Sequence, residues 1–244
     1  MQAENTQRVS PMTRKVLDYL SRVEYRRCDF SEDFEQICRL RFKAYQANGL
    51  LSADAGARVF DTMDELPNCY NFGVYHDGAL VSTLRIHHLH AEAPEGPSTV
   101  IHKDLIAPRI AAGERFVDPS RFASDPEWMS RNPEIPFITL RLAVMACIHF
   151  DVPYCLSTIR PEHAAFYKRI FNSRQIGELR SYPRITRQVA LYEADVKAIR
   201  SISFIRYPFF RSEPLEQRLL FERDASGMAP LTVLPSISSQ RFAA

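Results

Sequence analysis

The spacing of apolar residues along the chain predicts an alternating series of helices and strands. Apolar side chains recur after three or four residues, as on one face of a helix, in Phe34–Tyr45, Pro136–Ile148 and His163–Phe171. Ser31 and Gly49 stand where the first of these helices would begin and end. Strand-like patterns occupy Val23–Asp29, Glu114–Ser124, Tyr154–Ile159 and Gln188–Glu193.

Turn signals add a hairpin and a strand irregularity. Asp77-Gly78 separates two alternating segments within Asn71–Leu89, which is typical of a β-hairpin. Pro119 interrupts the Glu114–Ser124 strand and predicts a bulge or a sheet edge. Residues 51–68 are polar and indicate a long loop, and the pattern assigns no element to residues 99–112. The whole order predicts a mixed α/β fold around a partly antiparallel sheet.

Composition narrows the class of protein. The chain has 244 residues, of which 45% are hydrophobic and 25% charged, enough for a globular domain with a full core. Its 31 basic and 29 acidic residues leave a charge of +2, so we expect no nucleic-acid partner. Five scattered cysteines without a CxxC pair indicate reduced thiols, and no signal peptide or membrane-spanning run is visible. These features predict a cytoplasmic location.

Several common kinds of catalytic site are not indicated. The histidines His87, His88, His90 and His102 lack a carboxylate at ligand spacing, and adjacent strand residues point to opposite faces of a sheet. We therefore expect no metal. There is no GxSxG elbow, and no cysteine has local support as a nucleophile.

Four short motifs occur in an order that is found in one group of enzymes. They are Arg41-Phe-Lys-Ala-Tyr45, Phe60-Asp61-Thr-Met-Asp64, Leu84-Arg85 and Asp118-Pro-Ser-Arg121-Phe122. This ordered set resembles the motifs of acyl-homoserine lactone synthases. The stretch from Ser157 through Tyr167 to Gly177 makes the chain more similar to N-acyl amino acid synthases of the FeeM type.

The resemblance implies a fold and an activity. It implies an acyltransferase of the GNAT fold, with a mixed central sheet flanked by helices, in which the Glu114–Ser124 strand splays from the strand at residues 154–160. It also implies transfer of a medium or long acyl group from acyl carrier protein to the amine of an amino acid. The acyl-phosphopantetheine thioester, on the carrier protein or on coenzyme A, would be a substrate, and no tightly bound cofactor is expected. The match suggests a domain at 23–195, an N-terminal tail at 1–22 and a C-terminal extension at 196–244 packed on the domain.

The chain departs from the lactone synthases at two positions. Gln46-Ala-Asn-Gly49 stands where those enzymes carry a tryptophan, and Asp118 stands where their strand motif begins with glutamate. In addition, residues 125–142 contain no glycine, whereas acetyltransferases that use coenzyme A hold its pyrophosphate on a glycine-rich loop. This absence favours a carrier-protein donor.

The resemblance also implies roles for individual residues. Amine acylation requires a group that takes a proton from the amine and donors that polarise the thioester. We expect Asp118 to be this acid, held by Arg121, although a structural Asp–Arg pair is the alternative. Asp61 and Asp64 would bind the acceptor ammonium, and Arg85 would bind its carboxylate or brace the two aspartates.

The remaining predicted site residues are expected along the substrate path. Arg41 and Tyr45 lie one helical turn apart and would face the same pocket. Four residues are expected beside the acyl-pantetheine arm, namely Phe122, Ser157, Thr158 and Tyr167. They could contact the substrate or pack in the core, and both interpretations are open.

Two alternative functions and the role of one C-terminal segment remain open at this stage. A lactone-forming autoinducer synthase that uses S-adenosylmethionine is the alternative enzyme, and a catalytically idle domain that senses acyl supply is the alternative class. The segment Lys197–Arg211 has four basic residues and no acidic ones. It could dock an acyl carrier protein, contact a membrane surface or simply pack on the domain.

Overall fold

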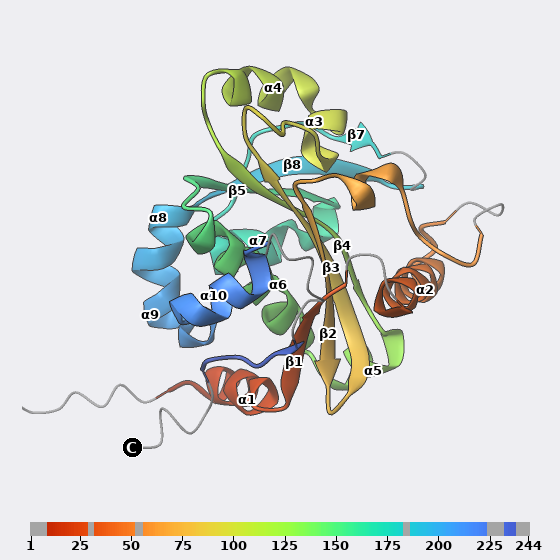
Figure 1. Ribbon diagram of the computed structural model, residues 1–244, viewed down its shortest axis with the longest axis vertical. Helices are drawn as coiled ribbons and strands as arrows, with labels where there is room; N and C mark the ends of the chain where they lie inside the picture. Colours follow the sequence, from red (N-terminus) through yellow and green to blue (C-terminus); the bar gives the residue numbers. More distant parts are fainter. Residues whose placement is uncertain (1–8, 29–31, 52–55, 183–185, 224–231, 238–244) are drawn as a thin grey trace, which may run out of the picture.

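The computed structural model describes residues 9–28, 32–51, 56–182, 186–223 and 232–237. Within these ranges a sheet of nine strands runs in the order β6-β8-β5-β4-β3-β2-β1-β9, with β7 paired to β8 (Figure 1). The strands are β1 Val23–Arg27, β2 Cys69–His76, β3 Ala79–Leu89, β4 Phe116–Ser124, β5 Tyr154–Ile159, β6 Arg174–Gln175, β7 Arg180–Ser181, β8 Gln188–Asp195 and β9 Thr232–Val233. The β4–β5 pair is parallel and the other pairs are antiparallel.

Helices cover both faces of this sheet, so the predicted mixed α/β fold with a central sheet flanked by helices is confirmed. The longer helices are α1 Pro11–Leu20, α2 Glu32–Ala47, α4 Lys103–Ala111, α6 Ile135–His149, α7 Ala164–Phe171 and α10 Pro214–Phe221. The shorter ones are α3 Pro97–Ile101, α5 Pro126–Arg131, α8 Val196–Ala198 and α9 Phe204–Arg206, with single turns η1 Thr62–Glu65, η2 Pro161–His163, η3 Ile199–Ser203 and η4 Pro208–Phe210. In Figure 1, α2 lies to the right of β3 and β4 and α6 to the left.

The main core lies between the sheet and α6. Alternate residues of the central strands, such as Phe72, Leu84 and Val117, point to this face and pack with α1, α6 and α10. Helix α6 is buried on almost every side, which explains its nearly continuous apolar sequence. The opposite face, under α2, α3 and α4, receives the alternate strand residues. Several of these are polar, and they form the site described below.

The predicted hairpin is confirmed, because β2 and β3 pair around Asp77 and Gly78, which both have positive φ. The bulge or sheet edge predicted at Pro119 is displaced in the structure, because Pro119 pairs regularly with Ile86 in an inner strand and the bulge follows two residues later. Opposite Leu84, β4 carries the two residues Arg121 and Phe122, and the register shifts at this point. Arg121 itself has φ +53°, a left-handed backbone conformation that is uncommon for arginine.

The predicted separation of β4 from β5 is also present. The two strands pair at Phe116 with Tyr154 and at Val117 with Cys155. From Asp118 onward β4 follows β3, while β5 continues along β8. The bulge lies in the separated part of β4, and the space between the diverging ends forms a cavity.

Four segments differ from the sequence-based expectation or go beyond it. Residues 11–20, treated as part of a tail, form α1, because Ser10 caps the helix and four apolar residues bury one face. Residues 99–112 belong to α3 and α4, the loop at 51–68 contains η1, and the polar stretch after β4 contains α5. The helix start predicted at Ser31 lies outside the described residues. No helix within the described ranges is long and apolar enough to cross a bilayer.

A buried ion pair joins the C-terminal segment to α6. Arg141 is fully buried and makes a bidentate pair with Glu216 of α10, which is itself 3% exposed. The same guanidinium donates to the carbonyl oxygens of Phe209 and Arg211 at 2.9 and 2.7 Å. Glu216 also accepts from the backbone and hydroxyl groups of Ser236. Arg141 therefore provides hydrogen bonds to backbone carbonyl groups in and after η4. Its partner Glu216 joins α10 to Ser236, which follows β9.

We predict that Glu216→Ala destabilises the protein by about 3 to 5 kcal/mol, because the substitution leaves the Arg141 charge buried without its partner. The free energy of unfolding, measured by urea denaturation, checks this. Arg39→Ala serves as the control, since Arg39 pairs with Glu35 on the surface of α2, and it should leave the urea midpoint almost unchanged. Equal midpoints for Glu216→Ala and the native protein would show that α10 does not depend on this pair.

Candidate active site

The cavity between β4 and β5 collects residues from distant parts of the chain. β4 contributes Pro119 to Phe122, β5 contributes Ser157 to Ile159, and Arg160 and His163 lie at the end of β5 and in η2. Tyr45 of α2, Tyr167 of α7 and Tyr182 complete the wall. Two largely apolar spaces share residues with this cavity. One is an open groove along α2 and α5, and the other is a buried pocket between β5, α6 and α7.

Beside the cavity, strand register brings polar residues into two rows on the face under α2 and α3. Asn71, Arg85 and Ser120 are cross-strand neighbours on β2, β3 and β4. His87 and Asp118 are neighbours in the next row. Because alternate residues of a strand share a face, all five side chains point away from the main core.

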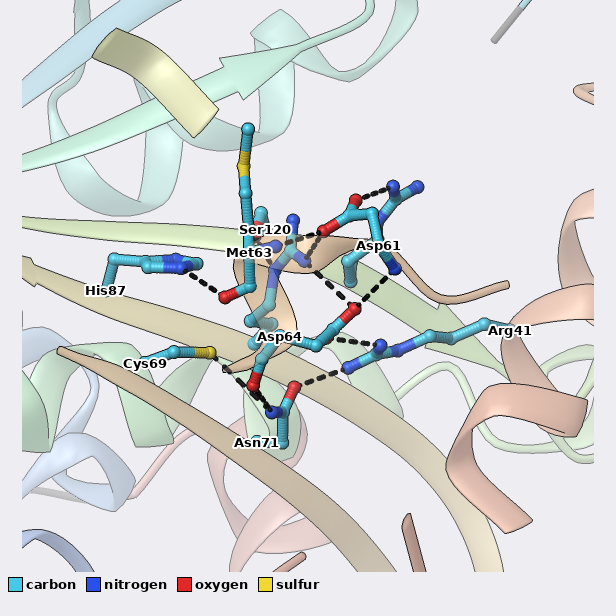
Figure 2. A network of polar contacts seen from close by, with 10 residues as sticks. Arg41, Asp61, Met63, Asp64, Cys69, Asn71, His87 and Ser120 are labelled. Carbon is cyan, nitrogen blue, oxygen red and sulfur yellow. Dashed lines mark hydrogen bonds and ion pairs between the residues drawn. The ribbon is translucent and has the colours of Figure 1, made fainter. Parts of the chain in front are cut away.

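The first row anchors a charged network (Figure 2). Arg85 donates from Nε to the Ser120 hydroxyl at 3.0 Å and from Nη1 to Asp61 Oδ1 at 2.6 Å. The same Nη1 lies 3.1 Å from Asp64 Oδ2. Arg85 is fully buried, and it is fixed between the sheet and the η1 loop. The structure therefore favours the bracing interpretation of Arg85.

Asp64 connects this network to α2. Its Oδ1 accepts from Arg41 Nη1 at 2.8 Å, and Arg41 Nη2 donates to Asn71 Oδ1 at 2.9 Å. Asp61 and Asp64 also form the capping box of η1, in which each carboxylate accepts a backbone N–H of the turn. Burial by itself raises the pKa of Asp64, but Arg41 and Arg85 outweigh it and the net pKa is lowered. Both aspartates are therefore held ionised within the protein.

Arg121 is the charged member of this network that lines the cavity. Its Nη2 pairs with Asp61 Oδ2, and its guanidinium contacts the rings of Tyr45 and Tyr182, 5.9 and 5.8 Å from their centroids. Burial raises the pKa of Asp61, yet Arg85 and Arg121 hold it well below its usual range. Three arginines and two aspartates leave the network with one excess positive charge. Arg121 Nε has no hydrogen-bond partner among the described residues.

Asp118 belongs to a separate polar group. It is fully buried, and its two oxygens accept from the Ser98 backbone N–H and the Ser98 hydroxyl, each at 2.8 Å. The Ser98 hydroxyl also lies 2.9 Å from the Thr158 hydroxyl, and Thr158 lines the cavity. Burial raises the pKa of Asp118 to about 6, although the two Ser98 hydrogen bonds and Arg85 work in the opposite direction. This carboxyl group is therefore close to titration at neutral pH.

Not all the predicted residues line the cavity. Its wall contains Tyr45, Arg121, Phe122, Ser157, Thr158 and Tyr167. The residues that are absent from its lining are Arg41, Asp61, Asp64, Arg85 and Asp118. The predicted pair between Asp118 and Arg121 is wrong, because the bulge turns Arg121 toward Asp61 while Asp118 stays on the sheet beneath α3. The expected contact of Asp64 with an acceptor ammonium conflicts with its burial, since its side chain is 0% exposed.

Other cavity residues were not found from the sequence. Tyr182 follows a two-residue strand and has no periodic pattern around it. Ser98, which bonds Asp118 behind the cavity wall, stands just before the segment to which no element was assigned. Arg160 and His163 follow β5 and also line the cavity. Their position as polar residues after a predicted strand was the sequence signal that could have identified them. For metal binding, the described part of the chain contains no cluster of three or more His, Cys, Asp or Glu side chains.

The fold, which the sequence predicted to be of GNAT type, agrees with known proteins. The structure of FeeM, an N-acyl amino acid synthase from uncultured soil microbes, matches with a TM-score of 0.62 and 20% identity over 76% of this chain and 97% of that one. BjaI, a CoA-dependent acyl-homoserine lactone synthase, matches with a TM-score of 0.52 and 13% identity over 73% and 83% of the two chains. No curated protein sequence matches the chain. The family model for the N-acyl amino acid synthase FeeM matches residues 36–195. The chain therefore belongs to the FeeM family of N-acyl amino acid synthases and is an acyltransferase.

Proposed function

We propose that this acyltransferase transfers a medium or long acyl group from a pantetheine thioester on acyl carrier protein to the amine of an amino acid. The observation that carries the proposal is the divergence of β4 and β5. It opens a cavity with polar groups in its wall, and an apolar groove shares residues such as Tyr45, Phe122 and Leu140 with that cavity. A pantetheine thioester arm could enter between the two strands. Its amide groups could hydrogen-bond to Ser157 and Thr158, as a peptide strand beside β5 would.

The open groove supports a long acyl chain. It has a volume of about 610 Å³ and is lined by apolar side chains such as Leu50, Phe122 and Met129. Burying methylene groups in such a space contributes about 0.8 kcal/mol per CH₂. The pocket between β5, α6 and α7 is apolar as well, but its volume of about 20 Å³ is too small for a chain. The groove would therefore favour a fatty acyl group over an acetyl group.

The segment after β4 supports a carrier protein as the donor. In this segment, the N-terminus of α5 is capped by Asp125, whose carboxylate accepts the N–H groups of Glu127 and Trp128. The next helix, α6, is preceded by Glu134. Carboxylates at these helix starts would repel the pyrophosphate of coenzyme A, which usually binds to free N–H groups at such a position. A carrier protein presents the same pantetheine arm without that pyrophosphate.

The C-terminal basic segment is our candidate for the carrier contact. Ile199, Phe209 and Phe210 belong to the core, so packing accounts for part of residues 197–211. Lys197, Arg200 and Arg206 remain exposed, together with Ile205. This charged face suits an acidic protein surface, while Ile205, the large exposed apolar residue among the side chains that the structure describes here, contributes little to membrane insertion.

The charge of the arginine network supports an amino acid acceptor. Arg121 brings the excess positive charge of the network to the cavity wall. A carboxylate bound there would complete the charge balance through a charge-assisted hydrogen bond. The amine of the same molecule would then point toward the thioester between β4 and β5. Asp118 is our proposed acceptor for the proton of that amine.

We predict that the purified protein makes an N-acyl amino acid from a long-chain acyl carrier protein and an amino acid, detected by mass spectrometry. The same acyl group on coenzyme A should react at least ~10-fold more slowly, because it lacks the carrier contact and meets the carboxylates after β4. Equal rates would contradict the carrier-protein assignment. A lactone formed from S-adenosylmethionine would identify the alternative synthase, and acyl binding without any product would identify a sensor.

We predict that Arg121→Gln raises KM for the amino acid by ~10- to 100-fold with a smaller effect on kcat, because it removes the charged partner of the carboxylate. Arg115→Gln is the control, since Arg115 bonds the carbonyl groups of Phe150 and Asp151 away from the cavity. Steady-state kinetics with the amino acid and with its amide check the role. The native enzyme should discriminate against the amide, and Arg121→Gln should discriminate less. Equal KM values for native enzyme and variant would rule out carboxylate binding by Arg121.

A further inference from the structure

We propose that the proton of the acceptor amine reaches Asp118 through two hydroxyl groups, first Thr158 at the cavity wall and then Ser98 of α3. The inference rests on the proposed function and assigns a route within the same site. It identifies Thr158 as the residue that contacts the amine. Ser98 and Asp118 act through it from behind the wall.

Burial makes such a route necessary if Asp118 is to take part. Its carboxylate is fully buried and does not line the cavity. The chain entering α3 covers it closely, because a Cβ atom at Gly96 would lie 2.7 Å from a Leu89 methyl carbon and 3.5 Å from Asp118 Oδ2. The Ser98 hydroxyl joins Asp118 to Thr158 in two steps of 2.8 and 2.9 Å.

The hydrogen-bond rules fix the direction of this chain. An ionised carboxylate only accepts, so the single proton of the Ser98 hydroxyl must point to Asp118 Oδ1. Ser98 Oγ can then only accept from Thr158, and the Thr158 proton points to Ser98. The free lone pair of Thr158 is thus left to accept an N–H from the cavity. Every donor in the chain is oriented to carry a proton away from an amine.

The groups around Asp118 keep it ionised and yet able to take a proton. On β3, Arg85 favours the carboxylate, and His87 is neutral because burial lowers its pKa to about 3. Ser98 of α3 supplies the two hydrogen bonds to the carboxylate. Burial outweighs these effects and raises the pKa of Asp118 to about 6. Near pH 7 the carboxylate is mostly ionised, with a greater proton affinity than an exposed aspartate.

The reaction balances with this route. The lone pair of the neutral amine forms the C–N bond, and the C–S bond of the thioester breaks with its electron pair left on sulfur. One proton moves from nitrogen to Thr158 as the Thr158 proton moves to Ser98 and the Ser98 proton to Asp118. The reverse sequence returns a proton to the thiolate, so Asp118 is ionised again and the thiol leaves.

The test compares two substitutions of Thr158 in single-turnover acylation with the full-length protein and its acyl-carrier-protein donor. Thr158→Val keeps the shape but removes the hydroxyl, and it should lower the acylation rate by ~100-fold. Thr158→Ser restores the hydroxyl and should stay within ~3-fold of the native rate. Thr139→Val is the matched control, because Thr139 is a buried threonine that bonds Ser82 outside the cavity. It should react at the native rate even if its melting temperature falls.

Two readouts separate a proton route from a packing role. The native rate should fall as pH drops through about 6, as Asp118 becomes protonated, and this dependence should be absent in Thr158→Val. Ser98→Ala combined with Thr158→Val should be no slower than the worse single variant, since both break the same chain. The route would be overturned if the rate losses of the two single variants multiplied in the double variant. It would also be overturned if Thr158→Val kept the native rate and pH profile. A native protein that acylates no amine would instead refute the proposed function, and the route with it.

Discussion

The separation of β4 from β5 is the constraint on which the rest of the site depends. Adjacent parallel strands normally continue their hydrogen bonding, but these two part after two residue pairs. The separated part of β4 carries the bulge at Arg121 and Phe122, where Arg121 has a left-handed backbone. That conformation is held by the pairing of Arg121 with Asp61 and by the contacts of its guanidinium with two tyrosine rings. The same residue therefore stabilises the opening and presents a positive charge to it.

Buried charge is the means by which the opening is kept in shape. Arg41, Arg85 and Asp64 are removed from water, at a desolvation cost that only multiple hydrogen bonds can offset. Each of the three has at least two polar partners, and together they join α2, η1 and three strands. Apolar residues could give comparable stability there. They would not fix the η1 loop and Asp61 in one position, and the cavity wall depends on that position.

Much of the fold and part of the site were predictable from the sequence. The hairpin, the buried helix α6 and the irregularity near Pro119 each have a local signal that depends on neighbouring residues alone. The ordered motifs located Arg41, Asp61, Asp64, Arg85 and Arg121 in one region, and the structure joins them in a single network. What the motifs could not supply was the partner of each charge. Asp118 and Arg121 are three residues apart, but an inserted residue in the bulge sends them to different neighbours, and the register with β3 decides this. Ser98 and Tyr182 had no pattern, because their importance comes from tertiary contacts.

The position of Asp118 reflects two requirements that conflict in a single side chain. A carboxylate that accepts a proton from an amine works better when burial raises its pKa, yet burial removes it from the substrate. In the proposed route the two requirements are divided among three residues. Asp118 stays buried beneath α3, where Gly96 closes over it, and Thr158 stands at the cavity with a hydroxyl that needs no charge to be exposed. Ser98 connects them because its backbone and its side chain both bind the carboxylate, so the distance from Asp118 to the cavity wall is set by one residue. Under this proposal the hydroxyl groups of α3 and β5 supply the reach that the short, buried aspartate lacks.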